Sequence, residues 1–522
     1  MLSFRPVCRL SAVLTPCLLL AAAAAHATTY YVSTTGADIN AGTSLTSPFA
    51  TLQHAITAAN QGDTVFVLSG TYKGQGNRNL DFAGTNLTLA AVNSDGTPGS
   101  VTLDAQNSGR GFLFQSHETA ASVINGFKII HGNIPDDAGG AVYIVASSPT
   151  FTNCTFDSNN AHLAGAVFVY NYANPTFTNC VFSNNTGRIG GATYMDYNTQ
   201  ASFTGCSFTG NSGLYGGAVY TYCSSDSYTD CTFDSNSGYV GGALYTTSNA
   251  TLTFTNATFS NNAAIDRGGA SFTGYKAILT FYNGVVFGNS ALSGGGFYNS
   301  YKSASNLYNT TMTGNSATSK GGAIYNGTYC SPTIFASILW NDKAGAGGNE
   351  IFNASTTSVP TVTYSDIQLS DTSNLWSDTS NKINTNLNAD PFFASANNPC
   401  DLHLQSSSPL INAGPATANS NSDQDGNPRI VNGLLDIGAY ELVPPVANAD
   451  SYRTAINTTL TVSAANGILA NDLANNGGTL SVIQVTKPVS GTLTLKSDGS
   501  FTYKAATGFT GTQYFTYKAK NS

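Results

Sequence analysis

Charged side chains are scarce in this chain. Only 9% of the residues are Asp, Glu, Lys or Arg, while Gly, Ser, Thr and Asn abound. The 28 acidic residues outnumber the 20 basic ones, so the formal charge is −8. This argues against a nucleic-acid partner, whose phosphates are bound through basic side chains. A composition so rich in uncharged polar residues is unusual for a cytoplasmic enzyme and suits a secreted rod.

Long apolar runs are missing after residue 27. Before it, Arg5 and Arg9 precede an apolar stretch from Leu10 to Ala25, and Ala25-His26-Ala27 has the small residues of a cleavage site. We therefore predict a signal peptide at residues 1–27, whose removal changes the formal charge from −8 to −10. No later run reaches the roughly 18 apolar residues that span a bilayer. We expect an extracellular or cell-surface protein, peripheral or anchored, without a transmembrane span in the mature chain.

The strong helix formers are also rare in the stretch from residue 130 to residue 341, which repeats one phrase, FTNCTFDSNN…GGAVY, every 25 to 27 residues. Thr, Phe, Tyr, Val, Ser, Asn and Gly favour strands and turns, and such a period indicates a solenoid. A coil of about 26 residues has room for three short strands, so we predict an all-β parallel β-helix with rungs about 4.8 Å apart.

One asparagine returns in every repeat. Identical residues stack in a solenoid, and a buried asparagine can bond its amide to the next one. We predict a structural ladder formed by Asn133, Asn159, Asn185, Asn211, Asn236, Asn262, Asn289, Asn315 and Asn341.

A second column is aromatic and follows the repeated glycines. It contains Tyr143, Phe168, Tyr194, Tyr220, Tyr245, Phe272, Tyr298 and Tyr325. Facing outward, these rings form a binding platform for sugars; facing inward, they form a core stack, which is the interpretation we favour. Alternation along the strand does not decide between the two.

The mature chain has seven cysteines, an odd number that cannot all pair internally. Cys154, Cys180, Cys206 and Cys231 stand one per rung, two residues before the Phe column. Metal ligands converge on a point, whereas these residues form a line, so we predict buried free thiols.

The remaining chain divides around the regular coils at residues 130–341. Residues 28–129 form an N-terminal cap, in which Ser47 is the expected N-cap of a helix over residues 48–60 that covers the open end of the solenoid. Irregular closing coils are expected at residues 342–443. Pro444 and Pro445 mark a linker, and residues 444–522 show the short alternating strands of a small β-sandwich.

These motifs carry a family resemblance. The FxxN and GGA repeats resemble polymorphic outer membrane protein repeats, and the opening YYVSTTGADINAGTSLTSPFATLQHAITAANQGDTVFVLSGTY and the segment DIGAYE resemble the ends of secreted bacterial right-handed β-helix proteins of the pectin-lyase-like fold. The segment ANADSYRTAINTTLTV…GSFTYKAATGFTGTQYFTYKA resembles bacterial Ig-like or cadherin-like domains. The resemblance implies a right-handed helix and a surface location. Relatives of the sandwich usually have one more strand after Ser522, so we expect a truncated domain.

Lyases and hydrolases of this fold need clustered acidic and basic residues. Asp157 and Asp234 are three rungs apart, about 14 Å, and cannot share a Ca²⁺ ion. Asp137, His162 and Arg188 stand three residues before the glycine column on successive rungs, with Asp136 adjacent, and form the candidate acid/base site. Solvated turn residues are the alternative interpretation, which we favour.

No cofactor or metal is expected. In the C-terminal domain the loop from Asn471 to Thr479, where relatives often bind Ca²⁺, has Asp472 as its single charged residue, so Ca²⁺ binding there should be weak or absent.

Two functions are consistent with this sequence. The nearly uniform rungs favour a non-catalytic surface protein, an adhesin or carbohydrate-binding rod, with a polysaccharide or a cell-surface or matrix component as partner. The alternative is a secreted polysaccharide lyase or glycoside hydrolase, which normally interrupts its rungs with charged residues and long loops.

Overall fold

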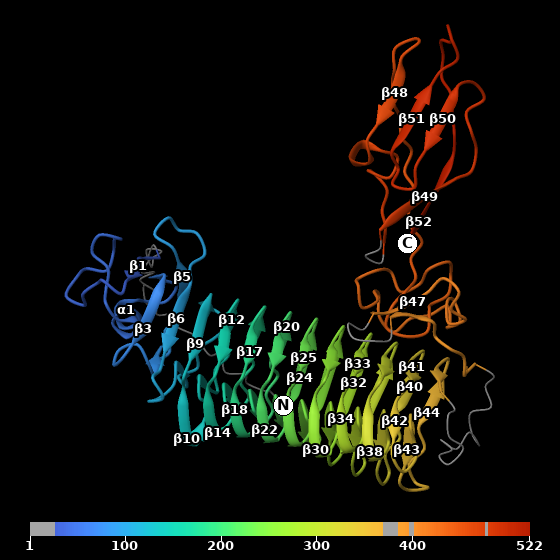
Figure 1. The fold of residues 1–522 in the computed structure, drawn as a ribbon. Helices are drawn as coiled ribbons and strands as arrows, with labels where there is room; N and C mark the ends of the chain where they lie inside the picture. The colour runs from blue at the N-terminus through green and yellow to red at the C-terminus, as the bar shows by residue number, and fades with distance from the viewer. Residues whose placement is uncertain (1–26, 369–384, 396–400, 476–478, 522) are drawn as a thin grey trace, which may run out of the picture.

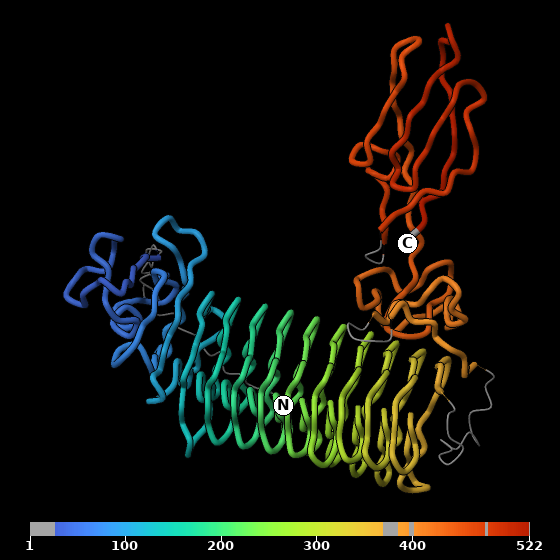
Figure 2. Tube along the Cα trace, in the orientation of Figure 1, coloured from blue at the N-terminus to red at the C-terminus, as the bar shows by residue number. Residues whose placement is uncertain are grey.

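The structure is a computed structural model and describes residues 27–368, 385–395, 401–475 and 479–521. Most of the predicted signal peptide, residues 1–26, lies outside this part. The chain from β1 (Thr29–Val32) to β45 (Asp366–Ile367) winds into a rod of parallel strands (Figure 1). The tube in Figure 2 shows the successive coils stacked along one axis. The predicted parallel β-helix is confirmed.

Each regular rung has four short strands, one more than expected. One rung consists of β20 (Ser202–Thr204), β21 (Ser207–Thr209), β22 (Ser212–Tyr215) and β23 (Val219–Tyr222). The extra break comes from Gly205, whose φ of +62° bends the chain between the first two strands. Such a positive φ is a turn signal that strand composition does not reveal.

Stacked rungs produce four parallel sheets. We call them sheets A, B, C and D. Sheet A runs from β1 to β44 (Thr361–Thr363), sheet B from β3 (Gly70–Lys73) to β45, sheet C from β4 (Leu80–Asp81) to β43 (Ile351–Asn353), and sheet D from β10 (Asn133–Ala138) to β42 (Lys343–Ala344). Along the chain each rung passes through A, B, D and C. Residues of neighbouring rungs pair in register, for example Phe182 with Phe208 and Tyr194 with Tyr220.

The core lies between these sheets and is built from aromatic columns. In sheet A, Phe177 stacks on Phe203 at 4.8 Å between ring centroids, and in sheet B, Phe182 stacks on Phe208 at 4.6 Å. The two columns meet edge to face, as aromatic pairs prefer. Cys154, Cys180, Cys206 and Cys231 are buried free thiols beside the sheet B column, as predicted.

The glycine pairs join sheet D to sheet C. At Gly216 the φ of +71° is left-handed, and a Cβ on Gly217 would lie 2.0 Å from the carbonyl oxygen of Gly242 in the next rung. The first position therefore needs positive φ and the second needs the absence of a side chain. On its inner side, sheet D lies directly against this turn, since a Cβ on Gly213 would lie 2.7 Å from the Gly216 carbonyl oxygen.

A short helix covers the N-terminal end of the rod. Helix α1 (Leu52–Ala58) buries Leu52, Ala55 and Ile56, so an amphipathic cap is present. It begins later than predicted, because Thr51 rather than Ser47 is the N-cap and accepts a hydrogen bond from the His54 amide. It also ends before residue 60, at a C-cap in extended conformation.

Beyond the last rung, β46 (Phe393–Ser395) and β47 (Asp401–Leu404) pair antiparallel, and the chain up to Glu441 folds back onto the rod. The C-terminal residues form two antiparallel sheets. One contains β48 (Thr459–Val462), β51 (Phe501–Lys504) and β50 (Thr492–Leu495), and the other β49 (Leu480–Gln484) and β52 (Tyr517–Asn521). They share a small core of Val462, Ile468 and Phe501. In Figure 1 these red strands stand beyond the closing segment of the rod.

Candidate functional site

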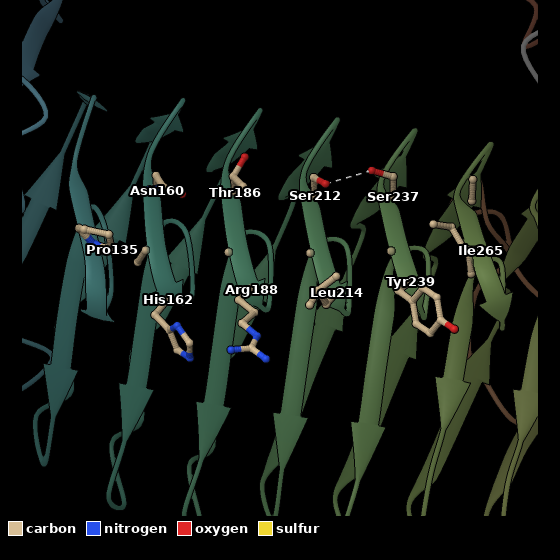
Figure 3. Close-up of a pocket in the computed structure, with 16 residues that line it drawn as sticks. Pro135, Asn160, His162, Thr186, Arg188, Ser212, Leu214, Ser237, Tyr239 and Ile265 are labelled. Carbon is tan, nitrogen blue, oxygen red and sulfur yellow. Dashed lines mark hydrogen bonds between the residues drawn. The ribbon is translucent and has the colours of Figure 1, made fainter.

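The outer face of sheet D is hollowed into a shallow groove that follows the rod axis (Figure 3). Three parallel rows of side chains shape it. One edge is the row Asn160, Thr186, Ser212, Ser237 and Ala263, which is polar except for Ala263, the floor is Ala161, Gly187, Gly213, Gly238 and Ala264, and the other edge is Pro135, His162, Arg188, Leu214, Tyr239 and Ile265.

The rows follow from strand alternation and register. Outward residues of each strand stack on those of the next, so Asn160 pairs with Thr186 and Thr186 with Ser212. The floor residues are all Gly or Ala because their Cβ positions face the glycine turns inside the rod. The groove holds about 630 Å³, and its six rungs extend roughly 24 Å at about 4.8 Å per rung.

The two ends of the groove differ in chemistry. His162 and Arg188 lie at the N-terminal end, and neither side chain has a hydrogen-bond or ion-pair partner within the described ranges. Leu214, Tyr239 and Ile265 continue the same row as exposed apolar or aromatic side chains. The sixteen lining residues include no Asp or Glu.

The predicted acid/base cluster is not assembled. The strand β10 bulges between Ile134 and Ala138, so Asn133 pairs with Asn160 but Ala138 pairs with Leu163. This extra length puts Pro135, not Asp137, in the row of His162 and Arg188. Asp137 instead forms an ion pair with Arg110, and Asp136 is exposed. The predicted cluster assumed a constant spacing before the repeated glycines, and the bulge in β10 changes that spacing.

The aromatic column faces outward, so the favoured inward interpretation was wrong. The residues on either side of Tyr143 along its strand, Val142 and Ile144, are buried, whereas Tyr143 itself is half-buried. The rings lie face to face along the rod, from Tyr143 and Phe168 at 5.3 Å to Tyr298 and Tyr325 at 4.4 Å between centroids. Because the faces cover one another, edges and hydroxyls point outward. The column is no open platform of ring faces for sugars.

The phenols of this column are neutral donors at ordinary pH. Burial raises the pKa of Tyr298 to about 12, with a further increase from Tyr325. Burial also raises the pKa of Tyr194, whose hydroxyl donates to Asp196 at 3.1 Å.

The asparagine column forms a hydrogen-bonded ladder, which is shorter than predicted. From Asn159 to Asn289, each side-chain amide donates to the Oδ1 of the next asparagine at 2.9 to 3.0 Å. At the start, the ladder position is Gly132, because Phe156 pairs with Ile129 rather than Ile130, and Asn133 faces outward. At the end, Asn315 donates to Asp342, and Asn341 is exposed. The predictions for Asn133 and Asn341 were wrong by one residue.

The closing segment contains two ionic groups that the sequence did not single out. His403 lies between Asp401, 2.5 Å from Nδ1, and Asp425, 2.6 Å from Nε2. Burial disfavours its charged form, but these two bonds outweigh burial and raise the pKa of His403 to about 9. Arg429 is buried and pairs with Glu441 at 3.4 Å. Their partners lie 2, 22 and 12 residues away and do not recur in a repeat, so no spacing signal marks them.

The described residues contain no group of three or more His, Cys, Asp or Glu side chains arranged to hold a metal ion. Asp157 is tied to Lys128 at 3.0 Å, and Asp234 accepts from Ser260 and Asn261. In the C-terminal domain, Asp472 accepts from the Tyr517 hydroxyl and from the amide of Asn448.

Comparison with protein families matches three parts of the chain. Residues 111–317 match the right-handed beta helix region, residues 309–327 the Chlamydia polymorphic membrane protein repeat, and residues 443–522 the bacterial cadherin-like domain. The chain joins a right-handed parallel β-helix to a bacterial cadherin-like domain. Its repeats fit a surface repeat protein. No curated protein matches the sequence.

Solved structures similar to this β-helix protein include several carbohydrate-active enzymes. Pectate lyase Pel9A is 14% identical, with a TM-score of 0.41, 79% of this chain and 96% of that chain covered. The GH136 lacto-N-biosidase from Eubacterium ramulus is 11% identical, with a TM-score of 0.45 and coverages of 64% and 68%. A rhamnogalacturonan lyase is 12% identical, with a TM-score of 0.40 and coverages of 78% and 95%. At these values, no activity is transferred to this chain.

Within the described ranges, no helix has the length and apolar character needed to cross a bilayer.

Proposed function

We propose that this chain is a secreted or cell-surface repeat protein that binds an extended polysaccharide in the groove of sheet D without cleaving it. The observation that carries the proposal is a linear groove across six rungs, edged by hydroxyl and amide groups and free of carboxylates. The roughly 24 Å length suits a chain of several sugar units better than a small molecule.

The groove offers the contacts that sugars use. Asn160, Thr186, Ser212 and Ser237 provide donors and acceptors for hydroxyl groups at one spacing per rung. On the opposite edge, Tyr239 is 47% exposed and has no stacked neighbour in its row, so its ring face is open to an apolar sugar face. Arg188 and His162 add donors at one end.

The absence of carboxylates from the groove lining supports binding over cleavage. Glycoside hydrolysis uses two carboxyl groups about 5 to 9.5 Å apart on either side of the bond. Metal-dependent β-elimination needs acidic side chains that hold Ca²⁺, and the lining residues include none. His162 and Arg188 provide a base and a cation, so the assay for unsaturated ends is the test of elimination without a metal.

The test is a binding and product assay on the protein from residue 28 onward. A panel of neutral and acidic polysaccharides, with and without Ca²⁺, is followed by affinity electrophoresis and by assays for new reducing or unsaturated ends. We expect retention without products. Tyr239→Ala and Arg188→Ala should each lower the affinity about tenfold, the equivalent of roughly 1.4 kcal/mol.

Two matched variants control for general effects. Tyr222→Ala removes a tyrosine of similar exposure from sheet C, and Arg453→Ala removes an exposed arginine from the C-terminal domain. Both should bind like the wild type. Products that disappear in His162→Ala would contradict the proposal, as would equal losses in the control variants.

A further inference from the structure

We propose a second binding surface on this protein, for an acidic polysaccharide, on the C-terminal half of sheet C and separate from the groove. The first observation is a local reversal of charge. From Arg267 to Asn341 the chain has no Asp or Glu but contains Arg267, Lys276, Lys302 and Lys320, whereas the whole protein has a formal charge of −8.

Folding brings these four cations to one face. Arg267, at the end of β30 (Ala263–Arg267), and Lys320, at the end of β38 (Ser316–Lys320), lie on the sheet D side of the aromatic column. Lys276 and Lys302 lie in the turns between sheets C and A, on the other side of the column. The cations therefore border the rings of Phe272, Tyr298 and Tyr325 on both sides. We call this face the cationic aromatic surface.

Contacts with the rings hold each cation in place. Arg267 lies 5.6 Å from the ring centroid of Tyr298, and the Lys320 Nζ lies 4.5 Å from that of Phe352. Lys276 contacts Tyr275 at 5.0 Å, and Lys302 contacts Tyr301 and Tyr329 at 5.2 and 5.6 Å. Such cation–π contacts position a charge without neutralising it.

The charges remain available to a partner. Arg267 shares its charge with Asp266 at 2.9 Å, but Lys276, Lys302 and Lys320 have no carboxylate partner among the described residues. Lys276 and Lys302 are exposed together with Tyr275, Tyr301 and Tyr329. The described part of the closing segment contacts the rod elsewhere, at Asn256 and Asn283 in the A–B corner and at Thr311 in sheet B.

The rings themselves favour an anion. Because the stacked faces are covered, the column presents ring edges, which carry the positive part of the aromatic quadrupole, and phenol hydroxyls, which are donors. Ring edges recur once per rung, and the hydroxyls of Tyr298 and Tyr325 lie on two adjacent rungs between the cations of the two sides. A flexible chain with carboxylate or sulfate groups at intervals therefore meets both donors and positive charges on this face.

An acidic polysaccharide fits this surface better than a nucleic acid does. Duplex DNA carries one charge per about 1.7 Å, and such a dense polyanion is repelled by a protein with net negative charge outside a small patch. A polysaccharide with at most one charge per sugar is repelled far less. The N-terminal half of sheet C lacks the same character, because Asp137 pairs with Arg110 there and Asp196 stands beside Tyr194.

The test compares polymers that share a backbone, dextran and a carboxymethyl dextran with at most one carboxylate per sugar, and adds polygalacturonate and a single-stranded oligonucleotide. The full chain should bind the two acidic polysaccharides at low salt, lose them as salt rises, and not bind dextran at this surface. The variant Lys276→Gln/Lys302→Gln/Lys320→Gln should bind the acidic polysaccharides about tenfold more weakly and with a shallower salt dependence.

A charge-matched control replaces three exposed lysines of the C-terminal domain, Lys487→Gln/Lys496→Gln/Lys518→Gln. It should bind the acidic polysaccharides like the wild type. The first triple variant should in turn keep the retention of uncharged polysaccharides by the groove, so failure here is distinguishable from failure of the groove proposal. Equal loss in both triple variants, or no loss in the first, would overturn the surface. Tighter binding of the oligonucleotide than of either acidic polysaccharide would contradict the choice of an acidic polysaccharide as the partner.

Discussion

Asn211 illustrates how a single buried side chain links three rungs. Its amide donates to the carbonyl oxygen of Phe182 at 2.9 Å and to Asn236 at 3.0 Å, while its Oδ1 accepts from the backbone and side chain of Asn185. Removing this side chain leaves donors and acceptors unpaired on both neighbouring rungs, where water has no access. The ladder therefore couples the rungs through buried hydrogen bonds.

We predict that Asn211→Ala lowers the free energy of unfolding by about 1–3 kcal/mol, because buried partners lose their hydrogen bonds. Asn160→Ala removes the same atoms from the exposed row of sheet D, where the amide contacts only Asn133, and should cost less than about 0.5 kcal/mol. Thermal and denaturant unfolding of both variants measures the difference. Equal destabilisation of the two variants would show that the buried ladder contributes no more to stability than an exposed asparagine does.

The ladder ends in a buried carboxyl group. Asp342 accepts from the amide of Asn315 through Oδ1, while its Oδ2 has no partner. Burial raises the pKa of Asp342 to about 7, above the value of about 3.9 expected for an unfolded chain. Burial and the adjacent Asp342 carboxyl also raise the pKa of Glu350. With the folded pKa raised, its stabilising contribution is complete below the unfolded pKa and is lost as the pH rises through about 7.

Asp342→Asn should therefore stabilise the rod in a pH-dependent way. The amide oxygen preserves the bond from Asn315, and the charge that must be neutralised on folding is gone. We expect a gain in unfolding free energy that is about 1–3 kcal/mol larger at about pH 8 than at about pH 4. Melting curves across this range check it, and a gain that does not depend on pH would contradict the assignment of the titration to this residue.

The ladder also shows what sequence resolves at the residue scale. In the middle of the rod, the period places Asn159 to Asn315 correctly, because turns of constant length keep the register. At Asn133 and Asn341 the register slips by one residue, where the flanking rungs are less regular. A column counted from one motif cannot detect such a slip.

At the scale of the elements, the glycine turn limits how the rung closes. Gly217 packs against the backbone of the next rung, so a methyl group there collides with the Gly242 carbonyl oxygen at 2.0 Å. Backbone atoms cannot move aside as a flexible side chain does. The turn and the narrow sheet D therefore depend on this residue.

Gly217→Ala should destabilise the protein by about 2–4 kcal/mol through this collision. Gly210→Asn is the control, because Gly210 has a φ of +64° and the equivalent positions in other rungs are Asn184 and Asn261, with φ of +54° and +55°. It should leave stability nearly unchanged. Denaturant midpoints compare the two, and a Gly217→Ala protein as stable as the wild type would refute the packing argument.

The direction of the aromatic column is an element-scale property that the sequence left open. Ala141 and Tyr143 share one parity and Val142 the other, and both patterns are apolar enough to form a core. In the structure Ala141 and Val142 are both fully buried, so the alternation of the strand begins only after the glycine turn. Counting alternate residues from Ala141 therefore does not give the direction of Tyr143.

At the scale of the whole molecule, the period predicted the rod but not the segment that closes it. Residues Phe393 to Glu441 lack the repeat and contact rungs more than one hundred positions earlier, as in the bond from Gln424 to Asn256. Their ionic pairs, His403 with Asp425 and Arg429 with Glu441, lie within this segment. Contacts of that range leave no local pattern in the sequence.

The rod has two proposed binding faces whose outward side chains differ in chemistry. The groove of sheet D lies on the rungs from residue 135 to residue 265, and the cationic aromatic surface lies on those from residue 267 to residue 352. Uniform rungs supply a straight scaffold, and substitutions at outward positions give each face its chemistry. We expect the two faces to bind independently, since they share no side chain.

Binding of an extended polysaccharide without cleavage is measured by calorimetry with oligosaccharides of increasing length. The glycan is first chosen as one that the full-length protein retains. We expect the affinity to rise with length until the oligosaccharide spans the roughly 24 Å groove and then to stay constant, while every oligosaccharide is recovered intact. Affinity that does not depend on length, or recovery of shortened or unsaturated products, would contradict it.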